Sequence, residues 1–244
     1  MPLSRRHKYI LTCLLVYWPG LFILTHIPLP NIGRQSGMSD KTMHLLAYLV
    51  LVFFFWHAIS PYVRVNWKKA KVWLILGAMV WYGAIDEYLQ GQVGRSADVG
   101  DFLADLAGTA LGLAILTVLS FWPGALVITG IFIFCLTNLS KIAGLYPQVH
   151  VNISFHLLAY AGFTLLWIEI LHRYFRLDMR SLKWFLVAAA GPICLLLVVK
   201  LSSPLFDKEV WVVDYLTAVT AIAGGTVISW AITLPHRDKT RQSE

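Results

Sequence analysis

The segment DKTMHLLAY at residues 40–48 places an aspartate, a lysine and a histidine at the start of a long apolar run. Asp40, His44 and Tyr48 recur four residues apart, so in a helix they lie along one stripe. Lys41 adds a cation beside that stripe. Charged groups in a membrane-type helix are costly, so this segment indicates a functional site.

A second polar segment is YGAIDEYLQ at residues 82–90, in which Gly83, Glu87 and Gln90 share one helical face. Glu87 lies well inside its expected helix, where an ionised carboxylate is expensive. The loop that follows supplies Arg95 and Asp98. We therefore expect this helix end to contribute an acid and an amide to the site.

The third segment is GRSADVGDFLADLAGTALG at residues 94–112. Asp101 and Asp105 precede Gly108 and Gly112 at helical spacing, so two carboxylates and two glycines share one face. Small residues allow membrane helices to approach each other closely. We expect this face to point into a helix bundle.

The combined set supports three alternatives. Glu87 or His44 could act as a general base beside Arg95 and Lys41, which would hold an anionic group. The carboxylates and His44 could instead hold a divalent cation, although no HExxH motif or Asp-rich calcium loop indicates one. The third alternative is a closed salt-bridge network whose only role is to stabilise the contact between three helix ends.

For the first alternative, we predict that Glu87, His44 and Asp101 are catalytic, and that a second group of side chains binds the substrate. That second group comprises Asp40, Lys41, Tyr48, Gln90, Arg95 and Asp105. No residue is assigned as a metal ligand, and no cofactor is identified. GxSxG, Gly-rich phosphate loop, haem and flavin motifs are all absent from the sequence. The three cysteines lie in apolar runs without a CxxC pair, which indicates neither a disulfide framework nor a zinc site.

The composition predicts that membrane helices position these residues. The chain is 58% hydrophobic and 14% charged, whereas soluble domains carry about 25% charged residues. Each uncharged stretch is near or above the roughly 18–20 apolar residues that cross a bilayer. These stretches are 9–33, 45–63, 106–140, 142–168 and 215–236. We predict an all-α, polytopic membrane helix bundle with about eight transmembrane helices.

The eight helices are expected at 9–27, 41–60, 71–90, 100–121, 125–142, 153–172, 182–201 and 209–233. The motif FWPGA at 121–125 is expected to break a long uncharged stretch into a tight hairpin. The basic-then-apolar N-terminus has an apolar run too long for a signal peptide, so we interpret it as a first spanning helix that is retained. The polar segment at 235–244 is expected to be a disordered cytoplasmic tail.

Positive charge is distributed unevenly along the expected bundle. Fourteen of the 20 lysines and arginines fall in the two termini and in the loops at 61–71 and 172–183, which lie on one side. Loops rich in Lys and Arg are cytoplasmic, so both termini are expected in the cytoplasm and the polar segments near the outer surface. The net charge of +7 follows from this bias, and no basic stripe interleaved with aromatics indicates nucleic acid.

The two halves of the chain repeat each other at an offset of 112–113 residues. HLLAY at 44–48 recurs at 156–160. This repeat predicts two fused four-helix units, at 1–123 and 124–234, related by a pseudo-two-fold axis along the membrane normal.

The second unit is expected to be a degenerate copy. It retains Asp214 at the position of Asp101 but carries Lys200 in place of Glu87 and Ala218 in place of Asp105. Two roles stay open: the second half either braces the first or completes a shared site.

At the three polar segments, the sequence resembles the VanZ-like family of membrane proteins. SDKTMHLLAY, YGAIDEYLQ and GRSADVGDFLADLAGTALG are similar, in order and spacing, to the family's D-K-x-x-H-x-x-x-Y, E-x-x-Q and R-x-x-x-x-x-D-x-x-x-[ND]-x-x-G. The resemblance covers about residues 10–120. It implies a cell-envelope location, since the family is named for a protein linked to low-level teicoplanin resistance, but it implies no particular reaction.

We therefore expect a multi-pass cell-membrane protein whose outward-facing polar site acts on or binds an envelope component, such as a lipid headgroup or a cell-wall precursor. Membrane lipids are the expected partners, and the resemblance implies a link to glycopeptide-antibiotic susceptibility. An enzyme and a non-catalytic binding or accessory protein both stay open. A transporter ranks last, because no Gly- or Pro-broken helices pair across the two halves.

Overall fold

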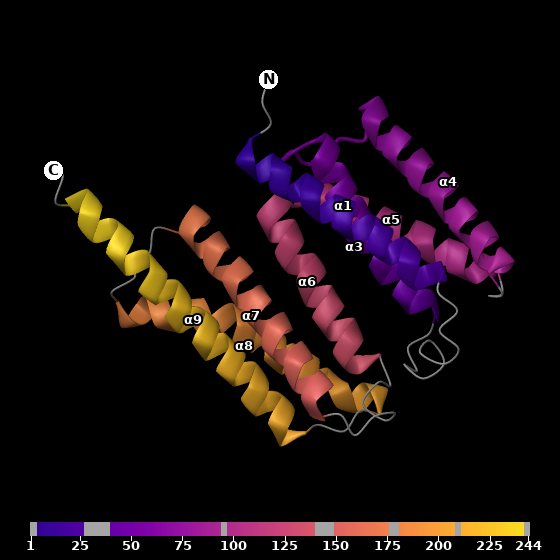
Figure 1. Ribbon diagram of the computed structural model, residues 1–244. Helices are drawn as coiled ribbons and strands as arrows, with labels where there is room; N and C mark the ends of the chain where they lie inside the picture. Colours follow the sequence, from indigo (N-terminus) through magenta and orange to yellow (C-terminus); the bar gives the residue numbers. More distant parts are fainter. Residues whose placement is uncertain are drawn as a thin grey trace. The chain divides into compact units, whose positions relative to one another are not determined.

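The computed structural model describes residues 4–26, 40–93, 97–139, 149–175, 181–207 and 211–241, which are helical almost throughout (Figure 1). These residues form eight α-helices and one short 3-10 helix, and none of them lies in a strand. The predicted all-α class is therefore confirmed.

The elements follow the chain as α1 (Arg5–His26), α3 (Asp40–Ile59), α4 (Ala70–Gln92), α5 (Val99–Val118), α6 (Phe121–Asn138), α7 (Val149–Tyr174), α8 (Leu182–Ser202), the 3-10 helix η2 (Ser203–Phe206) and α9 (Val212–Arg241). Seven stretches in α3 to α9 are long and apolar enough to cross a membrane. The apolar part of α1, His7–Ile23, is shorter. By length and composition, the chain is a multi-pass membrane helix bundle.

The chain divides into two compact units, Met1–Ile128 and Thr129–Glu244. The division falls inside α6, a few residues after the boundary at 123 and 124 that the internal repeat predicts. In Figure 1, unit 1 runs from indigo to magenta, and α7, α8 and α9 of unit 2 run from orange to yellow.

In unit 1, α3 and α5 form the closest helix pair because glycines remove the side chains between them. A Cβ atom on Gly108 would overlap the backbone of Leu45, and one on Gly112 would overlap the side chain of Val52. The glycine face of α5 is buried, as the small-residue pattern predicts. This contact fixes the spacing between the polar ends of the two helices.

The helices α1 and α4 pack beside this pair in unit 1. The hydroxyl of Tyr17 in α1 donates a hydrogen bond to the Ala47 carbonyl of α3 at 3.0 Å. The indole of Trp18 meets the ring of Tyr82 in α4 edge to face, with 5.5 Å between their centroids. These contacts hold α4 near α1 and bring its C-terminal end into the unit.

In unit 2, α7 packs closely on α9, with Gly225 of α9 against the side chain of Thr164. A buried apolar cluster that includes Ile168 and Trp184 joins α7 to α8. The start of α8 is fixed by Ser181, whose side chain accepts a hydrogen bond from the Trp184 backbone N–H at 3.2 Å. Unit 2 therefore has its own core.

The predicted break within FWPGA is wrong by a few residues. The interruption lies at Leu119 and Ser120, and α6 begins at Phe121 with Pro123 in its first turn. Proline is tolerated there because the first backbone N–H groups of a helix have no intrahelical partner.

α9 continues into the polar segment at 235–244 as far as Arg241, and the expectation of a disordered cytoplasmic tail stays a prediction. Once a helix is nucleated, each further residue adds a hydrogen bond at little cost. Lys and Arg are good helix formers, and cations are favourable at a helix C-terminus.

Candidate functional site

The polar residues of unit 1 gather where α3 begins, α4 ends and α5 begins. Six of them come together there: Asp40, Lys41, His44, Glu87, Asp101 and Asp105. The close packing of α3 on α5 explains this arrangement, because it aligns the first turns of both helices. The three segments predicted from spacing therefore form one cluster.

The deepest contact in the cluster joins His44 of α3 to Asp105 of α5. The His44 Nδ1 atom lies 2.9 Å from the Asp105 Oδ1 atom, and both side chains are almost completely buried. With Nδ1 carrying the proton, the ring donates to the carboxylate and its Nε2 atom becomes the available acceptor. Gly83 of α4 leaves room for this carboxylate, since a Cβ there would lie 3.3 Å from Asp105 Oδ2.

Lys41 forms a cationic bridge at the mouth of the cluster. Its Nζ atom lies 2.6 Å from Asp98 Oδ2 and 3.5 Å from Asp101 Oδ1. Its side chain is half-exposed, whereas that of Asp101 is buried. Gly100 makes room for this lysine, because a Cβ at that position would clash with the end of the Lys41 side chain.

Asp98 belongs to the site although it is absent from the predicted set. Its side chain caps α5 by accepting the Gly100 backbone N–H at 2.7 Å. The hydrogen bond from Lys41, followed by the one from Gly100, lowers the pKa of the Asp98 carboxyl below its usual value. An aspartate three residues before Asp101, at the expected helix start, is the N-cap signal that could have identified it.

Glu87 of α4 is buried beside this pair of helices. One of its oxygens, Oε2, accepts the backbone N–H of Asp98 at 3.0 Å. The other, Oε1, is buried and has no hydrogen-bond partner among the described residues. A buried carboxylate oxygen without a partner is uncommon in folded proteins.

Gln90 lies in a neighbouring network rather than in the cluster itself. Its Nε2 atom donates to Asp86 Oδ2 at 2.8 Å, and both side chains are buried. Asp86 also lies 3.8 Å from the Nδ1 atom of His26 at the end of α1. Neither Asp86 nor His26 is in the predicted set. The i, i+4 spacing of Asp86 and Gln90 is the signal that could have indicated their contact.

Tyr48 lies one turn deeper along α3. Its ring stacks on Tyr82 of α4 with 5.8 Å between centroids. Its hydroxyl is buried, has no hydrogen-bond partner in the described part of the chain, and interacts electrostatically with Asp105 and Glu87. The predicted Arg95 lies outside the described residues, and Asp40 is the exposed first residue of α3.

Two overlapping trios in this cluster have the composition and spacing of a metal site. One comprises Asp40, His44 and Asp101, and the other comprises His44, Glu87 and Asp105. In each trio, one potential ligand atom per residue lies within 4.8 Å of the other two.

In unit 2, the helix ends that correspond to the site of unit 1 carry fewer charged residues. Lys200 of α8 pairs with Asp214 of α9 at 2.9 Å, and both are buried. His156 and Tyr160, the counterparts of His44 and Tyr48, stack on each other with 6.1 Å between ring centroids. The partner of Lys200 therefore lies within its own unit.

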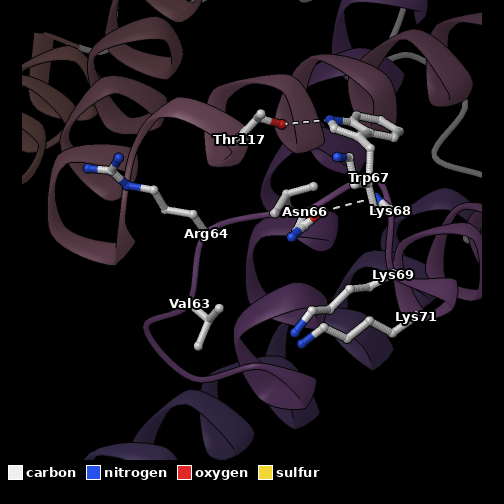
Figure 2. A pocket seen from close by; sticks show the side chains of 9 residues that line it. Val63, Arg64, Asn66, Trp67, Lys68, Lys69, Lys71 and Thr117 are labelled. Carbon is white, nitrogen blue, oxygen red and sulfur yellow. Dashed lines mark hydrogen bonds between the residues drawn. The ribbon is translucent and has the colours of Figure 1, made fainter.

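A cavity of about 560 Å³ lies at the other end of α3 and α4 (Figure 2). Four cationic side chains line it, namely Arg64, Lys68, Lys69 and Lys71, together with Trp67 and Thr117. The Trp67 indole N–H donates to the Thr117 hydroxyl at 2.8 Å. The lining contains neither a carboxylate nor a histidine, so this cavity offers positive charge but no acid–base pair.

Comparisons with known proteins add no assignment: no protein-family model, no curated protein and no solved structure matches this chain.

Proposed function

We propose that the chain is a VanZ-like membrane protein whose polar site binds or acts on a component of the cell envelope. One observation carries this proposal: a buried His44–Asp105 pair lies beside a carboxylate oxygen of Glu87 that has no hydrogen-bond partner among the described residues. Buried ionisable groups in membrane proteins are costly and usually functional. The proposed substrate is a lipid headgroup or a cell-wall precursor, because the site lies at the ends of apolar helices, near the expected membrane surface.

The site would face the outside of the cell membrane, with both termini in the cytoplasm. The support is the excess of Lys and Arg on the side that carries the loop at 61–71. A membrane-impermeant maleimide should then label a single cysteine at Val99, which is exposed beside the site, and not one at the exposed Val63. The opposite labelling pattern would reverse the orientation.

The proposed chemistry is general-base catalysis. Asp105 would hold the His44 ring in one tautomer and leave Nε2 to accept a proton. Lys41, half-exposed at the mouth, would attract an anionic group, and Asp101 would orient that lysine. Glu87 is the alternative base, since its Oε1 atom is available.

The direct test is Glu87→Gln, which keeps the size of the side chain and its acceptor for the Asp98 N–H while removing the charge. We expect loss of the envelope phenotype, measured as teicoplanin susceptibility and as the composition of lipid extracts, at an unchanged level of protein in the membrane. The control is Glu169→Gln, which neutralises an exposed carboxylate paired with Arg173 in unit 2. Full activity of Glu87→Gln would contradict the assignment.

The same extracts separate an enzyme from a binding protein. An enzyme should add or remove a lipid species when it is expressed, and Glu87→Gln should abolish that change. A susceptibility phenotype with unchanged extracts would instead indicate binding without turnover.

A further inference from the structure

We propose that the polar site holds one divalent transition-metal ion, bound by His44, Glu87 and Asp105. The three side chains come from α3, α4 and α5, and all are buried. One potential ligand atom of each lies within 4.8 Å of the other two. Ligands about 2.0–2.2 Å from a zinc ion lie up to ~4.4 Å apart, so binding requires only small movements.

Two oxygen atoms of this trio have lone pairs that no described residue uses. Glu87 Oε1 and Asp105 Oδ2 are buried without a hydrogen-bond partner among the described residues. The two residues are 7% and 0% exposed, so water does not solvate them from outside. Buried polar atoms are nearly always paired, and an ion between these oxygens would supply the missing partner.

The balance of charge also favours a cation. Four carboxylates are buried at the ends of α4 and α5, namely Asp86, Glu87, Asp101 and Asp105. Among the described residues, the one permanent cation that contacts this group is the half-exposed Lys41, while His44 and His26 contact it as imidazoles that carry charge only when protonated. Uncompensated negative charge in a low-dielectric interior is strongly unfavourable, and a divalent ion would neutralise it.

The donor set selects the class of metal. Imidazole favours zinc, iron, copper and nickel over calcium and magnesium, which prefer oxygen ligands, and the two carboxylates also suit manganese. Three protein ligands leave a position open for water or for an oxygen atom of a substrate, as in catalytic zinc sites. An ion there would activate the water or polarise a phosphoryl or carbonyl group in place of His44 or Glu87 as a free general base; this role rests on the proposed function, whereas binding of the ion does not.

A second position is geometrically available, formed by Asp40, His44 and Asp101. The inner trio is favoured because all three of its residues are buried, whereas Asp40 is exposed and Asp101 Oδ1 already lies 3.5 Å from the Lys41 ammonium. His44 is common to both trios, so variants of the carboxylates distinguish the two positions.

The test measures metal content directly. Protein purified in detergent is stripped with a chelator, incubated with Zn²⁺ or Mn²⁺, desalted and analysed by mass spectrometry of the elements. We expect one ion per chain in the wild type. Loss of a residue that only hydrogen-bonds to a metal ligand costs about 10–100-fold in affinity, so loss of a direct ligand in Glu87→Gln or Asp105→Asn should weaken binding by at least ~100-fold.

The matched control is His156→Gln, which alters the equivalent histidine of unit 2 and should leave the metal content unchanged. Thermal unfolding checks the fold: Zn²⁺ should raise the Tm of the wild type but not that of Glu87→Gln. If Asp40→Asn abolishes binding while Glu87→Gln retains it, the inner trio is wrong.

Equal metal content in the wild type and Glu87→Gln would overturn the proposal, as would wild-type protein that retains no ion. Because metal content and the envelope phenotype are measured separately, a failure here leaves the proposed function standing, and the reverse also holds.

Discussion

At the scale of single residues, Asp98 connects the parts of the site. Its carboxylate pairs with Lys41 and caps α5, while its backbone N–H reaches Glu87. One residue at the helix start therefore links α3, α4 and α5. Because of these contacts, a change in the charge of the Asp98 carboxylate should change the stability of the three helix ends.

The lowered pKa of the Asp98 carboxyl predicts a pH-dependent contribution to stability. A carboxyl with a lower pKa in the folded state stabilises the fold above its unfolded pKa of about 4, and this contribution is lost as the pH falls through the folded value. We expect Asp98→Asn to unfold at a lower temperature than the wild type at pH 7. The difference should shrink as the pH falls below about 4 and vanish below the lower, folded pKa of Asp98.

Asparagine suits this comparison because it also caps helices, so the variant removes charge and keeps the cap. Lys41→Gln should behave in the same way, and the double variant should add little. A stability difference that is independent of pH would show that the Lys41–Asp98 ion pair is not its cause.

At the scale of helices, the two glycines of α5 decide the geometry of the site. They let the backbones of α3 and α5 approach, which places His44 within 2.9 Å of Asp105. A helix pair separated by ordinary side chains would hold these groups too far apart for a hydrogen bond. The glycines thus act on the site without contacting it.

Gly108→Ala should therefore destabilise the protein and impair the site together. The added Cβ would overlap the Leu45 backbone, and overpacking of this kind costs about 1–3 kcal/mol. Thermal unfolding and metal content are the two measurements. We expect both to fall.

Gly77→Ala is the matched control, because nothing lies within 4 Å of a Cβ at that position of α4. Alanine is favoured over glycine in a helix by about 0.5–1 kcal/mol, so this variant should be neutral or slightly stabilised. A Gly108→Ala variant as stable as Gly77→Ala would show that the helices separate without cost.

At the scale of the whole molecule, the two units keep similar helix pairs but different polar contents. In the part of the chain that the structure describes, unit 1 buries a cluster rich in carboxylates, whereas unit 2 buries the Lys200–Asp214 ion pair and has Ala218 at the position of Asp105. A closed ion pair leaves no ligand position open. We interpret the Lys200–Asp214 pair as a contact that stabilises unit 2 itself.

This interpretation predicts how unit 2 responds to substitution. Removing one partner of a buried ion pair costs about 3–5 kcal/mol, whereas an apolar replacement of both is often neutral. We expect Lys200→Met to unfold well below the wild type, and the double variant Lys200→Met/Asp214→Leu to recover most of the loss. The double variant should also retain its metal and its envelope phenotype.

A stable double variant that loses the envelope phenotype would contradict a purely stabilising role of this ion pair. It would show that unit 2 contributes to the activity through these two residues.

Much of the molecule follows from the sequence alone. Uncharged stretches of bilayer length determine the all-α membrane class, because backbone groups in hydrocarbon must be satisfied within helices. Helical spacing also identifies the shared faces of His44 with Tyr48 and of Asp105 with Gly108. These features depend on local periodicity, which the sequence displays directly.

The tertiary structure decided which of those faces meet and at what distance. It paired His44 with Asp105, separated Gln90 into the Asp86 network, added Asp98, and gave Lys200 a partner in its own unit. It also moved the predicted helix break to Leu119 and Ser120 and extended α9. These outcomes depend on the packing of residues far apart in the chain, where the absence of a side chain at Gly108 matters as much as the presence of one at His44.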